Sequence, residues 1–420
     1  MIPTAALGLA LVAPLALPQE PPGPYRKLLT SVSENLHVER WRLDATDLGV
    51  AIDAGWSVEK LTLHGGRQEG VDLIVVDNGR LRIRVAPTRG MSLLDVRAGD
   101  LRLGWDSPVK EVVHPRTIDL ELRGGLGWLE GFNEGLVRCG LEYAGHPGTD
   151  RFVDNVGNES TMELTLHGRI GNLPASEVMV LVDRQPPHRI RVRGRVDERS
   201  FYGPQLELWA EVSTLPGEAG LRIDDTLTNR GPAEQEFQVI YHANFGPPLL
   251  EEGARFHGAL ERVTPFNDRA AEGLEGFDVY PAPTPGFVEQ VYCLRPWADD
   301  DGFSRILLAN ASADLAASIA WPREQLPYVT LWKNALSRAG GYVTGLEPGT
   351  GFPANRSVER AAGRVPTLAP GQSRRFTLDV ALHRGTDEVA AAVAAVEAVG
   401  AGRPTQVDPR PEPRPQPSKQ

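Results

Sequence analysis

The chain has few cysteines and no cysteine motif. Of its 420 residues only Cys139 and Cys293 are cysteines, and neither lies in a Cys-x-x-Cys pair or in a cluster with histidines. The spacing therefore supports neither a disulfide framework nor a thiolate metal site. We expect two unpaired cysteines in the core, the alternative being a bridge between them in an exported protein.

The sequence also lacks the short motifs of several large enzyme classes. It has no His-Glu-x-x-His, no P-loop, no complete Gly-x-Gly-x-x-Gly after a strand, no Gly-x-Ser-x-Gly and no EF-hand loop. Zinc hydrolysis, nucleotide use and serine-hydrolase chemistry are therefore unsupported. We expect no cofactor and no required metal ion.

Positive charge is in the minority, with 44 Lys and Arg against 55 Asp and Glu. The formal net charge is −11 and no basic stripe offsets it, so nucleic acid and anionic membrane surfaces are not expected partners. Neutral or small polar molecules fit this surface better. The oligomeric state is not indicated by the sequence.

Only the start of the chain is continuously apolar. The run from Ala5 to Leu17 has the length of a signal-peptide core and is too short to cross a bilayer as a helix. This favours a signal peptide over residues 1–20 and export to the periplasm or the medium. The alternative is a disordered start in a cytoplasmic protein. No later segment is predicted to span a membrane.

Turn-forming residues are abundant, with 44 Gly and 35 Pro. Short alternating segments such as 190–196, 206–212 and 221–228 recur about every ten residues, without long helices between them. This pattern predicts an all-β fold of large antiparallel sheets with few short helices. One helix is expected over 387–399, capped by Thr386.

The domain organisation follows from composition. We expect a Pro-rich linker at 21–26, one folded domain at 27–400, and a disordered tail rich in Pro and Arg at 401–420.

Two segments place a proton-carrying side chain beside turn-forming residues at the end of a strand. His242 lies in Tyr241-His242-Ala243-Asn244-Phe245-Gly246, and Glu347 lies in Gly345-Leu346-Glu347-Pro348-Gly349. An imidazole with a pKa near 6.5 and a carboxylate can together act as a general acid and a general base. A lone His or Glu at such a place is more often structural, so the hypothesis depends on the two side chains meeting.

Other segments combine aromatic residues, hydrogen-bonding groups and glycine, the mixture that binds a sugar ring. They contribute the candidate substrate-binding residues Arg89, His114, His167, Arg169 and Asn244.

Taken in order, a set of short motifs resembles the DUF4432 family, which is placed beside the aldose 1-epimerases in the galactose mutarotase-like superfamily. These motifs are Ala86-Pro87-Thr88-Arg89-Gly90-Met91, Gly104-Trp105-Asp106-Ser107-Pro108, Gly127-Trp128-Leu129-Glu130-Gly131-Phe132, Cys139-Gly140-Leu141, Leu166-His167-Gly168-Arg169-Ile170-Gly171-Asn172-Leu173-Pro174-Ala175, Tyr241-His242-Ala243-Asn244-Phe245-Gly246, Pro285-Gly286-Phe287-Val288-Glu289-Gln290 and Gly345-Leu346-Glu347-Pro348-Gly349.

The resemblance implies a β-supersandwich with an open sugar-binding cleft and a carbohydrate as the small-molecule partner. It maps the acid of mutarotases onto His242 and the base onto Glu347, with His242 kept protonated by a neighbouring carboxylate. The two groups are then expected to face each other across the sugar while the ring opens and closes as the other anomer.

Two other functions are compatible with the sequence. A lyase or epimerase acting on an oxidised sugar would use the same His and Glu, with Arg89, Arg138 and Arg169 stabilising an enolate. A non-catalytic carbohydrate-binding protein would use the cleft alone.

Overall fold

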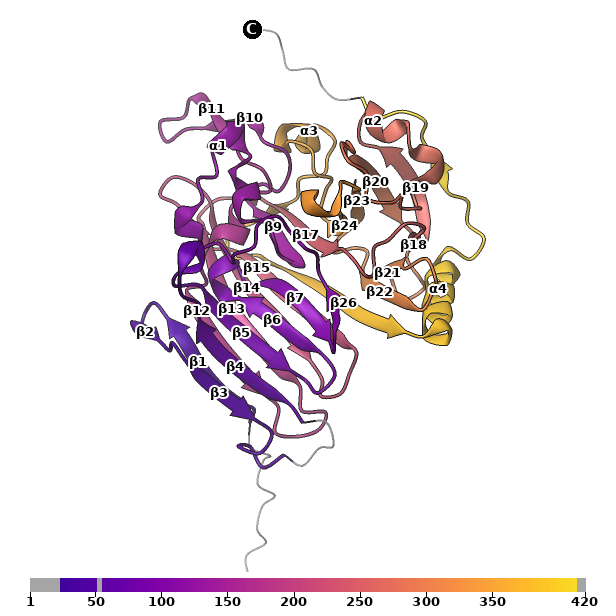
Figure 1. The fold of residues 1–420 in the computed structure, drawn as a ribbon. Helices are drawn as coiled ribbons and strands as arrows, with labels where there is room; N and C mark the ends of the chain where they lie inside the picture. The colour runs from indigo at the N-terminus through magenta and orange to yellow at the C-terminus, as the bar shows by residue number, and fades with distance from the viewer. Residues whose placement is uncertain (1–22, 51–54, 414–420) are drawn as a thin grey trace, which may run out of the picture.

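The computed structural model describes residues 23–50 and 55–413, and two large β-sheets dominate it (Figure 1). The larger sheet has thirteen strands in the spatial order β27 (Gln406–Val407), β19 (Leu260–Pro265), β20 (Gln290–Pro296), β23 (Tyr328–Asn334), β24 (Val343–Gly349), β17 (Gln238–Phe245), β9 (Leu136–Leu141), β7 (Ser92–Ala98), β6 (Arg82–Ala86), β5 (Asp72–Asp77), β4 (Ser57–Thr62) and β3 (Trp41–Asp44), with β8 (Leu101–Leu103) also on β7. All its pairs are antiparallel except β19 with β27.

The second sheet has ten strands, in the order β18 (Arg255–Gly258), β21 (Phe303–Ala309), β22 (Leu315–Pro322), β26 (Ser373–Arg384), β15 (Gly220–Asn229), β14 (Gln205–Thr214), β13 (Ile190–Arg199), β12 (Glu177–Val182), β1 (Tyr25–Ser31) and β2 (Leu36–His37). Two small pairs, β10 (Gly148–Val153) with β11 (Glu159–Leu164) and β16 (Gln235–Glu236) with β25 (Thr367–Leu368), lie outside the large sheets. The prediction of an all-β sandwich of large antiparallel sheets is confirmed.

The described helices are few, and all but the 15-residue α4 are short. They are α1 (Leu122–Gly125), α2 (Asp268–Ala271), α3 (Arg356–Ala361) and α4 (Thr386–Gly400), with the 3₁₀ turns η1 (Gly66–Gln68), η2 (Pro87–Arg89), η3 (Pro115–Thr117), η4 (Gly127–Gly131), η5 (Ile170–Asn172), η6 (Leu274–Gly276) and η7 (Arg338–Gly340). The helix expected over 387–399 is present as α4, but it is capped by Gly385 rather than by the Thr386 side chain. Among the described residues, no helix is long and apolar enough to cross a membrane.

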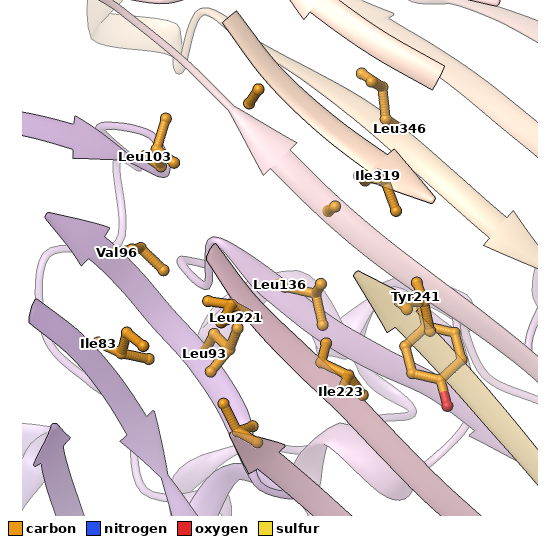
Figure 2. Close-up of a cluster of buried hydrophobic side chains, with 14 of the residues drawn as sticks. Ile83, Leu93, Val96, Leu103, Leu136, Leu221, Ile223, Tyr241, Ile319 and Leu346 are labelled. Carbon is orange, nitrogen blue, oxygen red and sulfur yellow. The ribbon is translucent and has the colours of Figure 1, made fainter. Parts of the chain in front are cut away.

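The main core lies between the two large sheets. Alternation along the strands sends one set of side chains into this space, as on β13, where buried and half-exposed residues alternate. Figure 2 shows Leu93 and Leu136 of the larger sheet beside Leu221 and Ile223 of the smaller one. Burial of this shared apolar surface holds the sheets together.

The chain after α4 is more ordered than expected from its composition. Residues 401–413 run along the edge of the larger sheet, where β27 pairs with β19. The Asp408 carboxylate accepts hydrogen bonds from the Arg262 guanidinium at 2.6 and 3.0 Å and from Thr264 Oγ1 at 2.6 Å. In the part of the expected tail from residue 401 to Pro413, specific ion pairs and strand pairing replace the missing apolar surface. At the other end, β1 begins at Tyr25, inside the expected linker.

The expected signal peptide at 1–20 lies outside the described residues. The two cysteines are buried in separate apolar clusters and no disulfide joins them.

A buried ion pair crosses the space between the sheets. Arg138 on β9 donates hydrogen bonds to both carboxylate oxygens of Asp225 on β15, at 2.5 and 2.9 Å, and Tyr241 on β17 donates its hydroxyl to the same carboxylate at 2.8 Å. None of the three side chains is exposed. Because a buried charge needs its partner, this group ties β9 and β17 to the opposite sheet.

Replacing Arg138 with Met should therefore lower the free energy of unfolding by about 3–5 kcal/mol, since the Asp225 charge would stay buried without its cation. Urea denaturation measures this loss. The partly exposed Arg262, which pairs with Asp408, provides the control, and Arg262→Met should cost less than ~1 kcal/mol. Equal small losses in both variants would contradict the structural role given to Arg138.

Candidate functional site

His242 and Glu347 meet because their strands are neighbours in register. β17 pairs with β24 so that Ala243 lies opposite Leu346, which places His242 opposite Glu347. On the next strand, β23, Thr330 is opposite Glu347. Side chains directly opposite each other share one face of a sheet. The sheet therefore aligns His242, Glu347 and Thr330 in one row.

This row lies on the face of the larger sheet that points away from the second sheet. Tyr241 and Leu346, the chain neighbours of His242 and Glu347, belong to the core between the sheets. Alternation then turns His242 and Glu347 to the opposite face. β17 is nevertheless buried at every position, because loops and the 3₁₀ turn η4 cover this second face.

Under this cover lies a pocket of about 270 Å³. Its lining residues are Leu126, Trp128, Leu129, Phe132, His146, Leu166, His167, His242, Glu289, Val291, Thr330, Trp332, Glu347 and Pro353. The volume is slightly below the ~300–1,000 Å³ typical of sites for drug-sized ligands. It suits one small molecule.

Aromatic rings surround the His242 imidazole. The ring centroids of Phe132, His167 and Trp332 lie 5.3, 5.2 and 5.5 Å from it, each edge-to-face, and Trp128 follows at 6.1 Å. Burial among these rings lowers the pKa of His242 well below 6.5, and the neighbouring His167 lowers it further. The imidazole is therefore neutral at neutral pH.

Asn244 decides which imidazole nitrogen carries the proton. Its amide nitrogen donates to the backbone carbonyls of Glu134 and His242, at 3.0 and 3.1 Å, so its Oδ1 must face the ring. Oδ1 lies 2.8 Å from His242 Nδ1 and can only accept. Nδ1 therefore bears the hydrogen, and Nε2 of the neutral ring is an acceptor.

Glu347 is a carboxyl group in the same apolar surroundings. Burial raises its pKa well above 4.5, and the negative charge of Glu289 at the pocket mouth raises it further. Its Oε1 lies 3.2 Å from His242 Nε2 and has no hydrogen-bond partner among the described residues. The contact alone would favour an imidazolium–carboxylate pair, but burial, the largest influence on both pKa values, favours the neutral pair.

The expected site differs from this geometry in one feature, and burial bears on a second. Burial lowers the pKa of His242 and raises that of Glu347, which disfavours the protonated imidazole that the resemblance implies. The two groups also touch each other instead of facing across a sugar ring, since they stand on adjacent strands of one sheet.

Gly345 makes the close approach possible. A Cβ atom at this position would lie 2.3 Å from Glu347 Oε1 and 3.1 Å from His242 Cε1. Any larger residue would displace one of the two groups.

His167 forms another wall of the pocket. Its backbone has φ of 59°, a left-handed conformation that is uncommon for residues other than glycine. Its Nδ1 donates to the Ala144 carbonyl at 3.1 Å. Burial lowers its pKa to about 4, so this imidazole is also neutral.

Of the five expected substrate-binding residues, His167 lines the pocket. Asn244 does not line it but holds the His242 ring through the hydrogen bond to Nδ1. Arg89 does not reach the pocket: this buried guanidinium donates to the carboxylate of Glu134 at 2.7 Å and also to Asn172. It therefore joins loops beneath the site.

His114 and Arg169 also lie elsewhere. His114 caps the turn η3 and accepts the backbone N–H of Arg116 at 3.1 Å. Arg169 pairs with Glu198 at 3.0 Å and with Glu142 at 3.4 Å, and it lines a separate, wider groove of about 960 Å³. Neither residue lines the His242–Glu347 pocket.

Several pocket residues were not among the sequence candidates. Thr330 and Trp332 are two apart on β23 and share the pocket face, and Glu289 accepts a hydrogen bond from the Trp332 indole at 2.7 Å. The alternation in Tyr328-Val329-Thr330-Leu331-Trp332 was the available signal, because it puts Thr330 and Trp332 on one face of a strand. Among residues 23–50 and 55–413, no cluster of three or more His, Cys, Asp or Glu could hold a metal ion.

The protonation state of His242 can be measured directly. At pH 6.5 an unperturbed imidazole would be half protonated, whereas His242 should be neutral with its hydrogen on Nδ1, because its pKa lies below that value. Nitrogen-15 NMR of labelled histidine distinguishes these forms, and the signal is assigned by its loss in His242→Gln. A doubly protonated ring at this pH would contradict the neutral pair.

The structure is similar to solved proteins of one fold. A crystal structure from Klebsiella pneumoniae subsp. pneumoniae, provisionally named an aldose 1-epimerase, has a TM-score of 0.88 and 39% identity over 94% of this chain and 100% of its own. A galactose mutarotase-like protein from Clostridium acetobutylicum has a TM-score of 0.51 and 15% identity, covering 82% and 99%. Galactose 1-epimerase from Lactobacillus acidophilus has a TM-score of 0.50 and 13% identity, covering 78% and 99%. The last two similarities concern the fold alone.

No curated protein matches the sequence. The model of a family described as a domain of unknown function, DUF4432, matches residues 68–382, which is most of the chain. The chain belongs to the DUF4432 family.

Proposed function

We propose that this protein is a carbohydrate-active isomerase that interconverts the anomers of an aldose. The observation that carries the proposal is the contact of His242 Nε2 with Glu347 Oε1, 3.2 Å apart in a pocket of about 270 Å³. The similarity to a protein provisionally named an aldose 1-epimerase supports the same class of reaction.

The adjacency of the two groups fits the reacting atoms of a cyclic sugar. The ring oxygen and the anomeric hydroxyl are both bonded to C1, so a donor and an acceptor that touch each other can reach both. Glu347, which holds the proton, lies beside the ring oxygen, and His242 Nε2, an acceptor, lies beside the hydroxyl. General acid and general base are then supplied together.

Ring opening is a double proton transfer. Glu347 gives its proton to the ring oxygen as the C1–O bond breaks, and His242 Nε2 takes the proton of the anomeric hydroxyl, which becomes the aldehyde oxygen. The pair is now a carboxylate and an imidazolium. After rotation about C1–C2, the C5 hydroxyl attacks the other face of C1, returns its proton to Glu347, and the new anomeric oxygen takes the proton from His242.

The direction of each transfer thus depends on the half-reaction. In ring opening Glu347 is the acid and His242 the base, the reverse of the roles expected from the resemblance. In ring closure the roles are the expected ones. The total charge of the pair stays at zero throughout, which suits a pocket in which burial penalises net charge.

The alternative reaction on an oxidised sugar requires cations in the pocket, and the expected arginines lie elsewhere. Arg89, Arg138 and Arg169 are held by Glu134, by Asp225, and by Glu142 with Glu198, and none of the three arginines lines the pocket. The part of the chain that the structure describes therefore places no arginine in the pocket to stabilise an enolate.

Replacing Glu347 with Gln removes the transferable proton and keeps the side-chain shape. Anomer exchange of free aldoses, followed by NMR, should fall by about 10²–10⁴-fold while sugar binding persists. Glu163→Gln, at an exposed carboxylate on β11 in the other groove, is the control and should exchange at the normal rate. Near-full activity in Glu347→Gln would end the assignment, and binding without exchange in the unaltered protein would indicate a non-catalytic sugar-binding protein.

The pair works only while it holds one proton, so the pH profile of kcat/KM should be bell-shaped. Protonation of His242 causes the acid limb, which should lie below pH 6.5 because the pKa of His242 is lowered. Deprotonation of Glu347 causes the alkaline limb, which should lie above pH 4.5 because the pKa of Glu347 is raised. Glu289→Gln removes a charge that raises the pKa of Glu347, so its alkaline limb should move to lower pH. An unchanged limb in Glu289→Gln would contradict Glu347 as the group that titrates there.

A further inference from the structure

The pocket contains unsatisfied hydrogen-bonding capacity beside the reacting pair. Thr330 is 1% exposed, and its Oγ1 has no hydrogen-bond partner among the described residues. It lies directly opposite Glu347, whose Oε1 also lacks a hydrogen-bond partner. Leaving a buried polar atom unpaired costs about 1–3 kcal/mol, so a ligand hydroxyl that reaches Thr330 would recover this cost.

Trp332 fixes one wall beside Thr330. Its indole N–H donates to Glu289 at 2.7 Å, which holds the ring in one orientation, and its ring stands edge-to-face to His242. An apolar wall next to a lone hydroxyl and a proton-carrying pair is an arrangement that binds the carbon face of a sugar and one of its hydroxyl groups.

The charges around the pocket limit what can enter. Its lining in the described chain includes the carboxyl groups of Glu289 and Glu347 but no Lys or Arg. Proteins usually bind carboxylates and phosphates through the cationic side chains of Lys and Arg. An anionic sugar here would lie next to Glu289 with no Lys or Arg to pair with, which is costly.

We propose that the pocket selects an uncharged aldose, with Thr330 as the specificity-determining residue that hydrogen-bonds one of its hydroxyl groups. This deepens the proposed function and rests on the same pocket. It makes two separable statements: sugars bearing a carboxylate or phosphate are rejected, and one sugar hydroxyl depends on Thr330.

The first statement is tested with matched sugars. Anomer exchange and binding are measured for glucose and galactose, for their uronates, and for their 6-phosphates. The uncharged sugars should have a kcat/KM on the order of 100-fold higher than the charged ones, because each anion would enter without a partner. Equal or faster exchange of a uronate or a phosphate would overturn this inference while leaving the epimerase function standing.

The second statement is tested by Thr330→Val, which keeps the shape of the side chain and removes its hydroxyl. Loss of one neutral hydrogen bond should raise KM about 10-fold with kcat nearly unchanged. Thr330→Ser should restore most of the loss. Thr228→Val is the matched control, because the Thr228 hydroxyl pairs with Ser373 far from the pocket, and it should have no effect.

A series of monodeoxy sugars separates recognition from a merely structural role. At one ring position, removal of the sugar hydroxyl should weaken binding to the unaltered protein about 10-fold. Binding to Thr330→Val should not change, since the shared hydrogen bond is already lost. If every deoxy sugar is weakened equally in both proteins, or if Thr330→Val matches the unaltered protein, Thr330 does not select the substrate.

Sugar binding measured on Glu347→Gln separates two negative outcomes: that Thr330 does not select the substrate, and that the protein is not an epimerase. Uncharged sugars that bind with Thr330 dependence but show no anomer exchange in the unaltered protein would end the epimerase proposal and support this one. Absence of binding by every uncharged sugar would overturn this inference.

Discussion

Burial of the central strands on both faces is the constraint on which the site depends. Tyr241 and Leu346 enter the core between the sheets, so their neighbours His242 and Glu347 must face the other way. The Arg138–Asp225 pair ties this region to the opposite sheet. The register that stabilises the sandwich is thus the register that aligns His242 with Glu347, and a shift of one residue would send them into the core.

The same burial influences the protonation states of His242 and Glu347. Removing water around an imidazole and a carboxyl group disfavours both charges, and the aromatic rings around His242 offer no compensating anion. Asn244 then fixes the tautomer, which leaves one lone pair of Nε2 directed at Glu347. In the proposed reaction the pair exchanges protons with the sugar while its total charge stays at zero, so its apolar surroundings need little reorganisation.

The sequence predicted the strands and the central pair better than it predicted the rest of the pocket. Strand alternation is a local signal, and both His242 and Glu347 stand out as proton carriers beside turn residues. The residue type of Arg89 and Arg169 suggests sugar binding, but their partners Glu134 and Glu198 lie 45 and 29 residues away and cannot be recognised without the fold. Thr330 was overlooked because its position matters only once β23 is placed beside β24.

The end of the described chain has a consequence for biosynthesis. β27 covers the edge strand β19, and Glu412 anchors the same segment to Arg364 at 2.9 Å. This cover is translated after every other strand of the larger sheet. A nascent chain on the ribosome therefore carries an open β edge until residues 406–412 have emerged, and during that interval it is vulnerable to pairing with neighbouring chains.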